Sequence, residues 1–487
     1  MIMLKEKDLT RLNTLGISKE ALDNQLQLFT AGIQPVHLHA AATIGQGIEK
    51  LDPQRLNTYI NKFFNEKNNI TIGRFVPASG AASRMFKAFF QFLENDIDSH
   101  EIQLFEHGYQ NFAFYDQIKC LRQADFACAI DNMINKIKLA DLPKALIPFH
   151  RYKDEIRTAL EEHLVESAFI IPEEHPVNLH FTISEAHQQK FDELIEAVVK
   201  KYSQRYHYKY NINFSYQSHK TDTVAVKPDN SLYRVENGNL LFRPGGHGAL
   251  IENLNNLDFD IIFIKNIDNV QTDNNKQEAA TYKQAMGGYL LMLQEKVKAH
   301  LISIAEGRSD LTETMTFITR ELHIVLPTSF NDLSEEAKKK FLFNKMNRPI
   351  RICGMVKNEG EPGGGPFWVS SSTGEITRQI VESSQINLQD EQQERIFNES
   401  THFNPVDIVC WVKDYQGNKF NLEEYIDPQT AFITEKTHNG EVIKVLEHPG
   451  LCNGAMANWI TLFVEVPITT FSPVKTITDL LRQQHQT

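Results

Sequence analysis

The loop at residues 78–84 carries residue types that bind phosphate groups in α/β proteins. Ala78, Ser79 and Gly80 follow a β-rich run, and Arg84 begins a helical pattern. Small side chains let backbone N–H groups approach a phosphate, a helix start favours negative charge, and an arginine can bind phosphate through two donors. The alternative interpretation is a tight strand-to-helix turn in which Gly80 supplies an unusual backbone dihedral. Both interpretations stay open on this segment alone.

A second candidate cation is Lys144, in the run LPKALIP. This lysine follows a bend that Pro143 fixes, and its ammonium group would serve as a point charge for a phosphate. The plainer alternative is a solvated lysine, which is the usual state of a single one.

The glycine-rich segment RPGGHG at residues 243–248 is suited to binding a flat ring. Gly246 and Gly248 stand on either side of His247. Because glycine has no side chain, a nucleotide base could lie against the main chain there. A simple glycine-rich turn is the alternative explanation.

An acidic residue, Asp268, follows soon after this segment in the sequence NIDN. It comes just past the apolar run 260–264, and ligands bind to open α/β sheets at the carboxyl ends of buried strands. A carboxylate in that place suits Mg²⁺, which prefers oxygen ligands and substrate phosphates. An Asx turn would explain NIDN by itself, but its position directly after the glycine-rich segment favours a nucleotide site.

The elements predicted to position these residues alternate between strands and helices. Apolar, β-rich runs predict strands at 70–76, 179–184, 211–216, 260–264, 350–356, 376–381, 406–412 and 459–466. Helical patterns predict helices at 185–203 and 248–257. Near-continuous apolar strands that alternate with helices predict a mostly parallel sheet covered on both faces, and therefore an α/β fold.

The chain is predicted to form one large α/β domain at 69–487, with a helical N-terminal extension at 1–68. Helical insertions are expected at about 86–140 and 272–346. The net charge of −12 argues against a nucleic-acid partner, because such proteins usually carry a basic face.

The sequence indicates a soluble cytoplasmic protein with no membrane segment. Its N-terminus is charged, and no apolar run approaches the length that a bilayer requires. The five cysteines contain no CxxC pair, which predicts reduced thiols rather than disulfides or a zinc site. His37 and His39 alternate along the chain without a nearby third ligand and are predicted to be structural.

Taken in order, these segments resemble the UDP-sugar pyrophosphorylases, which include the UDP-glucose and UDP-N-acetylhexosamine enzymes. The most specific match is RPGGHGALIENL followed by DIIFIKNIDNV, and FSPVKTITDLL near the C-terminus is similar to another segment of the superfamily. The resemblance runs in patches from about residue 74 and looks like that of a diverged bacterial branch. It implies a Rossmann-like nucleotidyltransferase fold of the GT-A type, with a sugar-side half at about 348–487.

The resemblance also implies roles for individual residues. It assigns nucleotide binding to Ala78, Ser79, Gly80, Gln217, Gly246, His247 and Gly248. It assigns phosphate neutralisation to Arg84, Lys144 and Lys475, and sugar contacts to Gly354, Glu382 and Asn404. Asp268 would bind Mg²⁺. The implied reaction joins UTP and a sugar 1-phosphate to give a UDP-sugar and pyrophosphate.

The sequence departs from the superfamily pattern in three places. Ser79 and Ala82 replace glycines of the phosphate loop, and a long insertion separates that loop from Lys144. The segment EGEPGGGPFWV also differs from the common sugar-side sequence, so the resemblance does not identify the sugar. Two alternatives therefore stand beside the enzyme hypothesis. One is a catalytically degenerate protein that binds a nucleotide or nucleotide sugar. The other is a glycosyltransferase, although NIDN fits the pyrophosphorylases better than a DxD-type metal motif.

Overall fold

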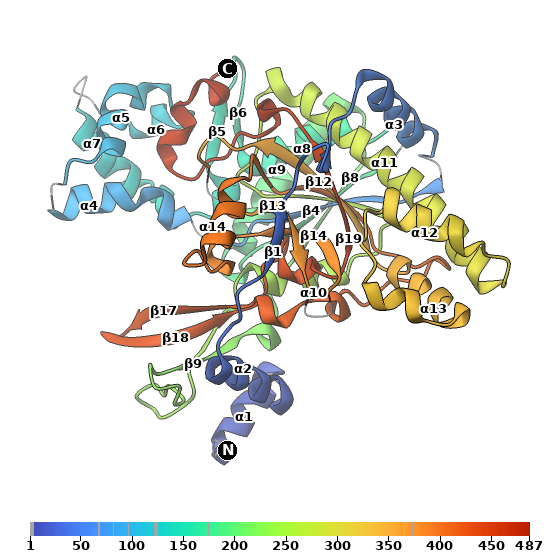
Figure 1. The fold of residues 1–487 in the computed structure, drawn as a ribbon. Coiled ribbons are helices and arrows are strands. Elements are labelled where there is room, and N and C mark those ends of the chain that lie inside the picture. The colour runs from blue at the N-terminus through green and yellow to red at the C-terminus, as the bar shows by residue number, and fades with distance from the viewer. Residues whose placement is uncertain are drawn as a thin grey trace.

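A long twisted sheet forms the centre of the molecule (Figure 1). The computed structural model describes residues 4–66, 69–80, 82–95, 97–120, 125–173, 175–361, 363–371 and 374–487. Within these residues the sheet has ten strands in the order β2-β3-β19-β12-β16-β11-β4-β7-β8, with β15 paired to β12. The strands are β2 (Thr43–Ile44), β3 (Gly47–Glu49), β4 (Ile72–Pro77), β7 (Val177–Thr182), β8 (Tyr210–Ser215), β11 (Ile261–Lys265), β12 (Ile350–Lys357), β15 (His402–Phe403), β16 (Asp407–Trp411) and β19 (Ile460–Glu465).

The sheet is mostly parallel, as the apolar strand pattern predicts. Strand β4 lies between β7 and β11 and is parallel to both, and β12 is parallel to β19. Strand β16 runs antiparallel to its neighbours β11 and β12. The α/β fold class expected from the sequence is therefore confirmed.

The order of the strands reverses between β4 and β11. From β4 the chain adds β7 and β8 on one side, and it then returns to place β11 on the other side of β4. Because the connections leave β4 and β11 in opposite directions, a crevice forms at their carboxyl ends, where ligands bind in open α/β sheets.

Helices cover both faces of this sheet, and the sequence of β11 shows why. Ile261 and Phe263 belong to the hydrophobic cluster on one face, whereas Ile262 and Ile264 belong to the cluster on the other. Alternate side chains of a strand point to opposite faces, so a strand buried on both faces is apolar throughout. The long helix α11 packs against α3 and α8, and α10 contributes to the second cluster.

The helices differ widely in length. They are α1 (Glu6–Leu15), α2 (Lys19–Ala31), α3 (Pro53–Asn65), α4 (Lys87–Asn95), α5 (His100–Gly108), α6 (Tyr115–Ile118), α7 (Phe126–Asp131), α8 (Ala159–Ile170), α9 (Gln188–Tyr206), α10 (Ile251–Asn255), α11 (Asp273–Ala305), α12 (Leu311–Arg320), α13 (Glu335–Met346) and α14 (Glu391–Asn398). Helices α4 to α7 lie within the first predicted insertion and α11 to α13 within the second.

A smaller lobe projects from the main body beside the N-terminus (Figure 1). Its sheet has the order β10-β9-β18-β17, with β9 (Thr223–Val226), β10 (Phe242–Arg243), β17 (Phe432–His438) and β18 (Glu441–Glu447). Leu12 and Leu22 of the first two helices pack on Val224 and Leu446 of this sheet. The two remaining sheets join β1 (Leu38–Ala41), β13 (Gly365–Ser370) and β14 (Ile376–Val381), and β5 (Pro148–Arg151) with β6 (Ile156–Thr158).

The N-terminal segment is less separate from the main domain than we expected. It does contain the helices α1, α2 and α3, but residues 38–49 form strands. Strand β1 pairs with β13, and β3 pairs with β19 in the central sheet. These partners lie more than 300 residues away, so no local sequence pattern could indicate the pairing. Residues 1–3, 67 and 68 of the predicted extension lie outside the described residues.

The expectation of five reduced thiols was wrong for one pair. Cys120, after α6, and Cys128, in α7, form a disulfide with a Cα–Cα distance of 6.3 Å. This Cα–Cα distance is within the range that a disulfide spans. Cys353, Cys410 and Cys452 are buried free thiols, as predicted. Residues 96 and 121–124 of this insertion lie outside the described residues.

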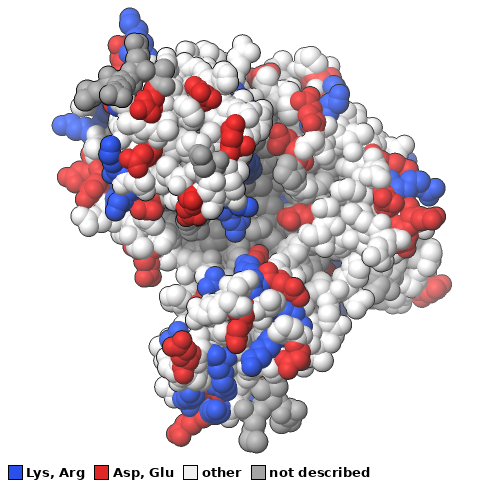
Figure 2. Space-filling view, turned by 90° about the vertical axis from the view of Figure 1, so that its left-hand side faces the viewer, with Lys and Arg blue, Asp and Glu red and all other residues white. Residues whose placement is uncertain are grey.

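No helix in the described ranges combines the length and the apolarity needed to cross a membrane. On the face drawn in Figure 2, Lys and Arg side chains are mixed with Asp and Glu side chains, and the surface is hollowed between the main body and the smaller lobe.

Candidate functional site

Asp268 is at the centre of a small charged cluster next to the reversal point of the sheet. One of its carboxylate oxygens, Oδ2, accepts hydrogen bonds from Lys144 Nζ at 2.9 Å and from Lys475 Nζ at 3.1 Å. The other oxygen, Oδ1, is buried and has no hydrogen-bond partner in the structure. Asp268 as a whole is only 7% exposed, whereas the Lys475 side chain is 50% exposed. Two ammonium groups and one carboxylate leave this cluster with an excess of positive charge.

The end of β11 and a C-terminal segment hold Asp268 in place. Strand β11 is fully buried, and Asp268 follows it by three residues. Residues 470–475, which we call the C-terminal strap, lie alongside: Val474 N donates to Asp268 O at 3.0 Å and Ser472 N donates to Asn269 Oδ1 at 3.0 Å. These backbone contacts bring Lys475 to a carboxylate 207 residues earlier in the chain.

Lys144 reaches the cluster from a short 3-10 helix that Pro143 precedes. Its Nζ also donates to Val474 O at 2.9 Å, so the lysine contacts both the strap and Asp268. The insertion between the phosphate-type loop and Lys144 folds back on itself, because Ala82 N donates to Leu142 O at 3.3 Å. Lys144 and the loop that starts at Ala78 are therefore neighbours despite their separation in sequence.

The charge state of Asp268 follows from these contacts. Burial by itself would raise the pKa of the carboxyl, but Lys144 and Lys475 together hold that pKa below its ordinary value. The carboxylate is therefore ionised at neutral pH. A charged oxygen, Oδ1, stays free to bind a cation or a donor.

A cavity of about 340 Å³ opens beside this cluster. Five of the residues singled out in the sequence line it: His247, Asp268, Glu382, Asn404 and Lys475. Further lining residues are Pro77 at the end of β4, Asn266, Phe403, Val406, Asn453 and Phe471. The structure thus gathers residues from the nucleotide-side and the sugar-side predictions around one cavity.

The glycines of the RPGGHG segment have an internal structural explanation. Gly246 has φ +79°, in the left-handed region that favours glycine. A Cβ on Gly248 would lie 2.0 Å from Pro449 O, so only glycine permits this close approach of two backbones. The segment packs on residues 448–451, and Leu451 N donates to His247 Nδ1 at 3.2 Å. That bond leaves Nε2 of a neutral His247 as the protonated nitrogen, on the wall of the cavity.

The sugar-side residues make contacts within the protein. Asn453 Nδ2 donates to Glu382 Oε1 at 2.5 Å, and Asn404 Nδ2 donates to Gly354 O at 3.1 Å. Gly354 is buried in β12 and supports Asn404 rather than lining the cavity. Next to Asn404, Val406 has φ +57°, which is costly for a β-branched residue. Such strain is typical of functional sites, where the surrounding contacts fix an unfavourable backbone.

The remaining predicted residues are not among those that line the cavity. Ala78 is buried, Ser79 is half-buried, and Gly80 is exposed with open space around it. Gly80 does not adopt the left-handed backbone, so an unusual dihedral does not explain this glycine. Arg84 is exposed at the surface, and Ala81 lies outside the described residues. Gln217 follows β8, and its Nε2 is buried without a hydrogen-bond partner.

Sequence reasoning missed the segment His448–Gly454, which contributes Leu451, Cys452 and Asn453 to the cavity. The signal was a cluster of proline, glycine and asparagine before a strand-like run, which by itself predicts only a turn. Asn269, which is 1% exposed and has an unpartnered Nδ2, was likewise overlooked within NIDN.

A cation at Asp268 would need further ligands from a substrate, because the described part of the protein supplies only one carboxylate oxygen there. Among the described residues, no group of three or more His, Cys, Asp or Glu side chains could hold a metal. The free Oδ1 of Asp268 can supply one oxygen ligand. Mg²⁺ is commonly bound by one or two carboxylates, with water and substrate phosphates completing its coordination, so this donor set fits that ion.

Comparison with known structures defines the class of fold. A UDP-N-acetylglucosamine pyrophosphorylase from Trypanosoma brucei, in complex with an inhibitor, is similar with a TM-score of 0.50 and 11% identity. The similarity covers 98% of this chain and 79% of that one. A mutant UDP-glucose pyrophosphorylase from Leishmania major, in complex with UDP-glucose, is similar with a TM-score of 0.46 and 12% identity over 99% of this chain and 80% of that one. The fold is that of the UDP-sugar pyrophosphorylases.

The chain belongs to the DUF4301 family, described as a domain of unknown function, whose profile matches residues 5–486. No curated protein matches the chain.

Proposed function

We propose that this protein is a nucleotidyltransferase that joins UTP and a sugar 1-phosphate to form a UDP-sugar, with release of pyrophosphate. The observation that carries the proposal is the cluster of Asp268, Lys144 and Lys475 at the sheet reversal, beside the 340 Å³ cavity. An excess of positive charge suits phosphate groups, and the free carboxylate oxygen suits their counter-ion. Similarity in fold to UDP-sugar pyrophosphorylases agrees with this chemistry.

In the proposed reaction, an oxygen of the sugar 1-phosphate attacks the α-phosphorus of UTP. A new bond forms between that oxygen and the α-phosphorus. The bond from the α-phosphorus to the bridging oxygen of the β-phosphate breaks, and pyrophosphate leaves with the electron pair. No side-chain nucleophile takes part, so the protein acts by positioning two anions and by neutralising their charge.

Each part of the site has a role in this scheme. Lys144 and Lys475 would neutralise phosphate oxygens, and Asp268 would hold Mg²⁺. A bound Mg²⁺ would supply charge neutralisation at the phosphates. His247 and Gln217 would bind the base through their free N–H donors. Glu382 would accept hydrogen bonds from sugar hydroxyls, and Asn404 would form hydrogen bonds with them. Arg84, Ser79 and Gly80 would contact phosphate as the loop approaches the ligand.

The test is pyrophosphate release, measured with Mg²⁺ for each of the four ribonucleoside triphosphates and a panel of sugar 1-phosphates. We expect release with UTP and a restricted set of sugars. Asp268→Asn should lower the rate of this release about 10²- to 10³-fold, and a surface variant, Glu295→Gln, should retain it. Release that is undiminished in Asp268→Asn would refute the role of this residue.

Other outcomes point to the alternatives. If no pair reacts but UTP or a UDP-sugar binds with dependence on Lys475, the protein is a nucleotide-sugar binding protein rather than an enzyme. If a finished UDP-sugar is consumed in the presence of an acceptor and pyrophosphate is never formed, the protein is a glycosyltransferase. The cytoplasmic location expected from the sequence is part of this proposal, because the substrates of such an enzyme are intracellular metabolites.

A further inference from the structure

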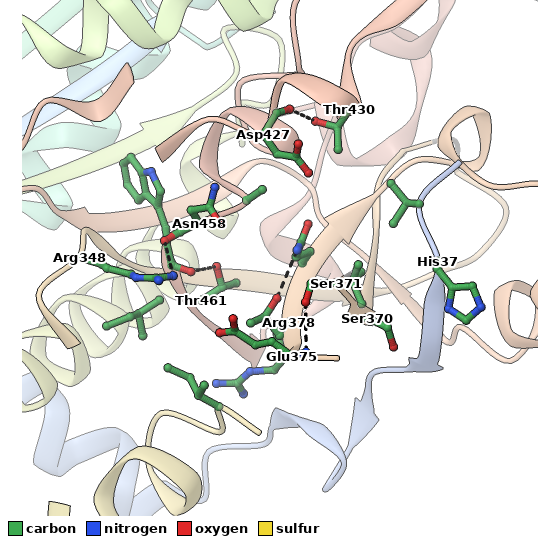
Figure 3. A pocket seen from close by; sticks show the side chains of 18 of the residues that line it. His37, Arg348, Ser370, Ser371, Glu375, Arg378, Asp427, Thr430, Asn458 and Thr461 are labelled. Carbon is green, nitrogen blue, oxygen red and sulfur yellow. Dashed lines mark hydrogen bonds between the residues drawn. The ribbon is translucent and has the colours of Figure 1, made fainter. Parts of the chain in front are cut away.

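A second cavity, of about 810 Å³, is separate from the cluster around Asp268. Figure 3 shows side chains that surround it from several parts of the chain, among them His37, Arg348, Arg378, Asp427 and Thr461. These residues come from the linker after α2, from the end of α13, from β14, from the loop before β17 and from the start of β19. A cavity of this volume can hold a small metabolite.

This cavity lies at the opposite edge of the central sheet from the proposed catalytic site. Arg348 precedes β12, and Thr461 is the second residue of β19, so the cavity is at the amino ends of these parallel strands. Asp268, in contrast, follows the carboxyl end of β11. Strand β14 connects the two regions: Arg378 lines the large cavity, and Ile380 lines the smaller one.

Arg378 is a buried cation that forms no ion pair with a carboxylate among the described residues, although the charge of Glu49 favours its protonated form. It is 3% exposed, and its guanidinium donates to Gly47 O at 3.0 Å and to Leu322 O at 3.3 Å. Its Nε is buried and has no hydrogen-bond partner. Burial lowers the pKa of Arg378 to about 10, which leaves it protonated at neutral pH. A buried charge without a counter-ion is unfavourable, so an anion at this position would stabilise it.

A second guanidinium, that of Arg348, is half-buried on the same cavity. It donates through Nε to Asn344 O at 3.0 Å and through Nη1 to Asn458 O at 3.4 Å. Both acceptors are neutral carbonyl groups, and no carboxylate in the described chain forms an ion pair with it. An arginine has five N–H donors, so several stay free for a ligand.

The carboxylates that line the cavity are already engaged. Glu375 forms an ion pair with Lys345, and Asp427 Oδ1 accepts a hydrogen bond from Gln429 N at 3.0 Å. Their negative charge is therefore only partly available to the two arginines. The balance of charged side chains around the cavity is positive.

A further donor on the cavity also lacks an acceptor. The Nε1 of Trp459 is buried and has no hydrogen-bond partner, and the residue as a whole is only 3% exposed. Buried N–H groups are nearly always hydrogen-bonded in folded proteins. Two unpartnered donors, Nε of Arg378 and Nε1 of Trp459, lie on one cavity with two guanidinium groups that form no ion pair among the described residues. This excess of donors favours an acceptor-rich ligand.

We propose that this cavity is a second ligand site that binds an anionic small molecule, with a phosphate or carboxylate group held by Arg348 and Arg378. A purely structural role for Arg378 would explain its bonds to Gly47 and Leu322, which tie β14 to neighbouring segments. It would not explain the unpaired Arg348 or the free indole N–H. An oxyanion suits the two guanidinium groups, because arginine binds phosphate and carboxylate through paired donors.

The test is isothermal titration of the full-length protein with inorganic phosphate, glucose 6-phosphate, AMP and citrate. Arg348→Gln removes a charge that is only half-buried, and Asn458→Asp places a negative charge at an exposed position on the cavity wall. Lys475→Gln is the matched control, because it removes one charge from the other site. Circular dichroism and thermal unfolding establish that each variant is folded.

We expect at least one of these probes to bind the wild-type protein. Its affinity should fall at least about tenfold in Arg348→Gln and in Asn458→Asp, and it should be unchanged in Lys475→Gln. Binding of citrate alone would identify a carboxylate ligand, and binding of phosphate-containing probes alone a phosphate ligand. The proposal is overturned if no probe binds, or if binding is the same in the two cavity variants as in the wild-type protein. It is also overturned if binding depends on Lys475 only.

Discussion

Glu166 and Asp268 each form ion pairs with two cations, but the Glu166 cluster is fully buried, whereas the Asp268 cluster is partly exposed. Glu166, in α8, pairs through Oε2 with Arg74 and through Oε1 with Lys265, each at 2.5 Å, and all three residues are at most 2% exposed. Asp268 accepts both of its lysines through Oδ2 and keeps Oδ1 without a partner.

The difference separates a structural ion cluster from a binding site. At Glu166 every carboxylate oxygen has a cation, and further bonds from Arg74 to Ser167 and His163 complete the cluster in the interior. At Asp268 one cation, Lys475, is half-exposed, and the remaining oxygen borders a cavity. A carboxylate whose two oxygens are both paired in the interior holds a fold together, whereas an unpaired oxygen and a half-exposed cation beside a cavity are available for a ligand.

The largest expected effect is on stability, at Glu166. Glu166→Gln leaves Arg74 and Lys265 buried without their counter-ion, and we expect the free energy of unfolding to fall by about 3–5 kcal/mol. Denaturant unfolding followed by circular dichroism measures this loss. Glu295→Gln, which removes a surface partner of Lys62, should cost no more than about 1 kcal/mol. Equal effects of the two substitutions would contradict the distinction.

The next effect is on activity, at Asp268. Asp268→Asn should lower kcat for pyrophosphate release by about 10²- to 10³-fold, because it removes the charge that holds the cation at the phosphates. Its free energy of unfolding should change by only about 1 kcal/mol, since Lys475 can turn to solvent. A loss of stability as large as that of Glu166→Gln would place Asp268 among the structural ion pairs instead.

The two lysines should differ from each other. Lys475→Gln should reduce kcat/KM about 10- to 100-fold with little change in stability, because a half-exposed cation is lost from the phosphates. Lys144→Gln should reduce activity similarly and also destabilise the fold by about 1–3 kcal/mol, because Val474 O loses its donor. Lys475→Arg is the control that retains the charge. If Lys475→Gln unfolds more readily than Lys144→Gln, the assigned burial of the two lysines is wrong.

The smallest effect concerns pH. The pKa of Asp268 is held below its ordinary value, so its pairing contributes stability above about pH 4 that is lost as the pH falls through the folded-state pKa. Asp268→Asn removes this titration, and the difference in unfolding free energy between pH 7 and pH 3 should narrow by less than about 1 kcal/mol. Glu166, whose pKa is also lowered, should account for a larger share of the acid sensitivity. An unchanged pH profile in Asp268→Asn would show that the pair contributes nothing.

The sequence was most informative where the signal was local. The apolar run of β11, followed by NIDN, predicted both the buried strand and the place of Asp268 at its carboxyl end. The parallel sheet followed from strands whose residues are apolar on both faces, as Ile261 and Ile262 illustrate. His247 was singled out in its glycine-rich segment, whereas Glu382 and Asn404 were assigned through the resemblance, and all three line the cavity beside Asp268.

Non-local contacts could not be predicted in this way. Strand β9 pairs with β18 at residues more than 200 positions apart, and neither strand is long enough to show a clear period. Lys475 was identified only through a resemblance, because no pattern in its own segment shows that Val474 bonds to Asp268. Likewise, the large cavity between Arg348 and Arg378 forms from segments that lie far apart in the chain, and each one looks ordinary alone.

The C-terminal strap has a consequence for the biosynthesis of this protein. Lys475 is the last of the site residues to leave the ribosome, and it reaches Asp268 only through the backbone bonds of residues 470–475. The residues of β11 and of the ion pair between Lys144 and Asp268 are synthesised long before that moment. A polypeptide interrupted between residues 466 and 474 would therefore contain all ten strands of the central sheet but lack the second ammonium group. Incomplete translation products could bind a phosphate weakly, but they would not have the complete charge cluster.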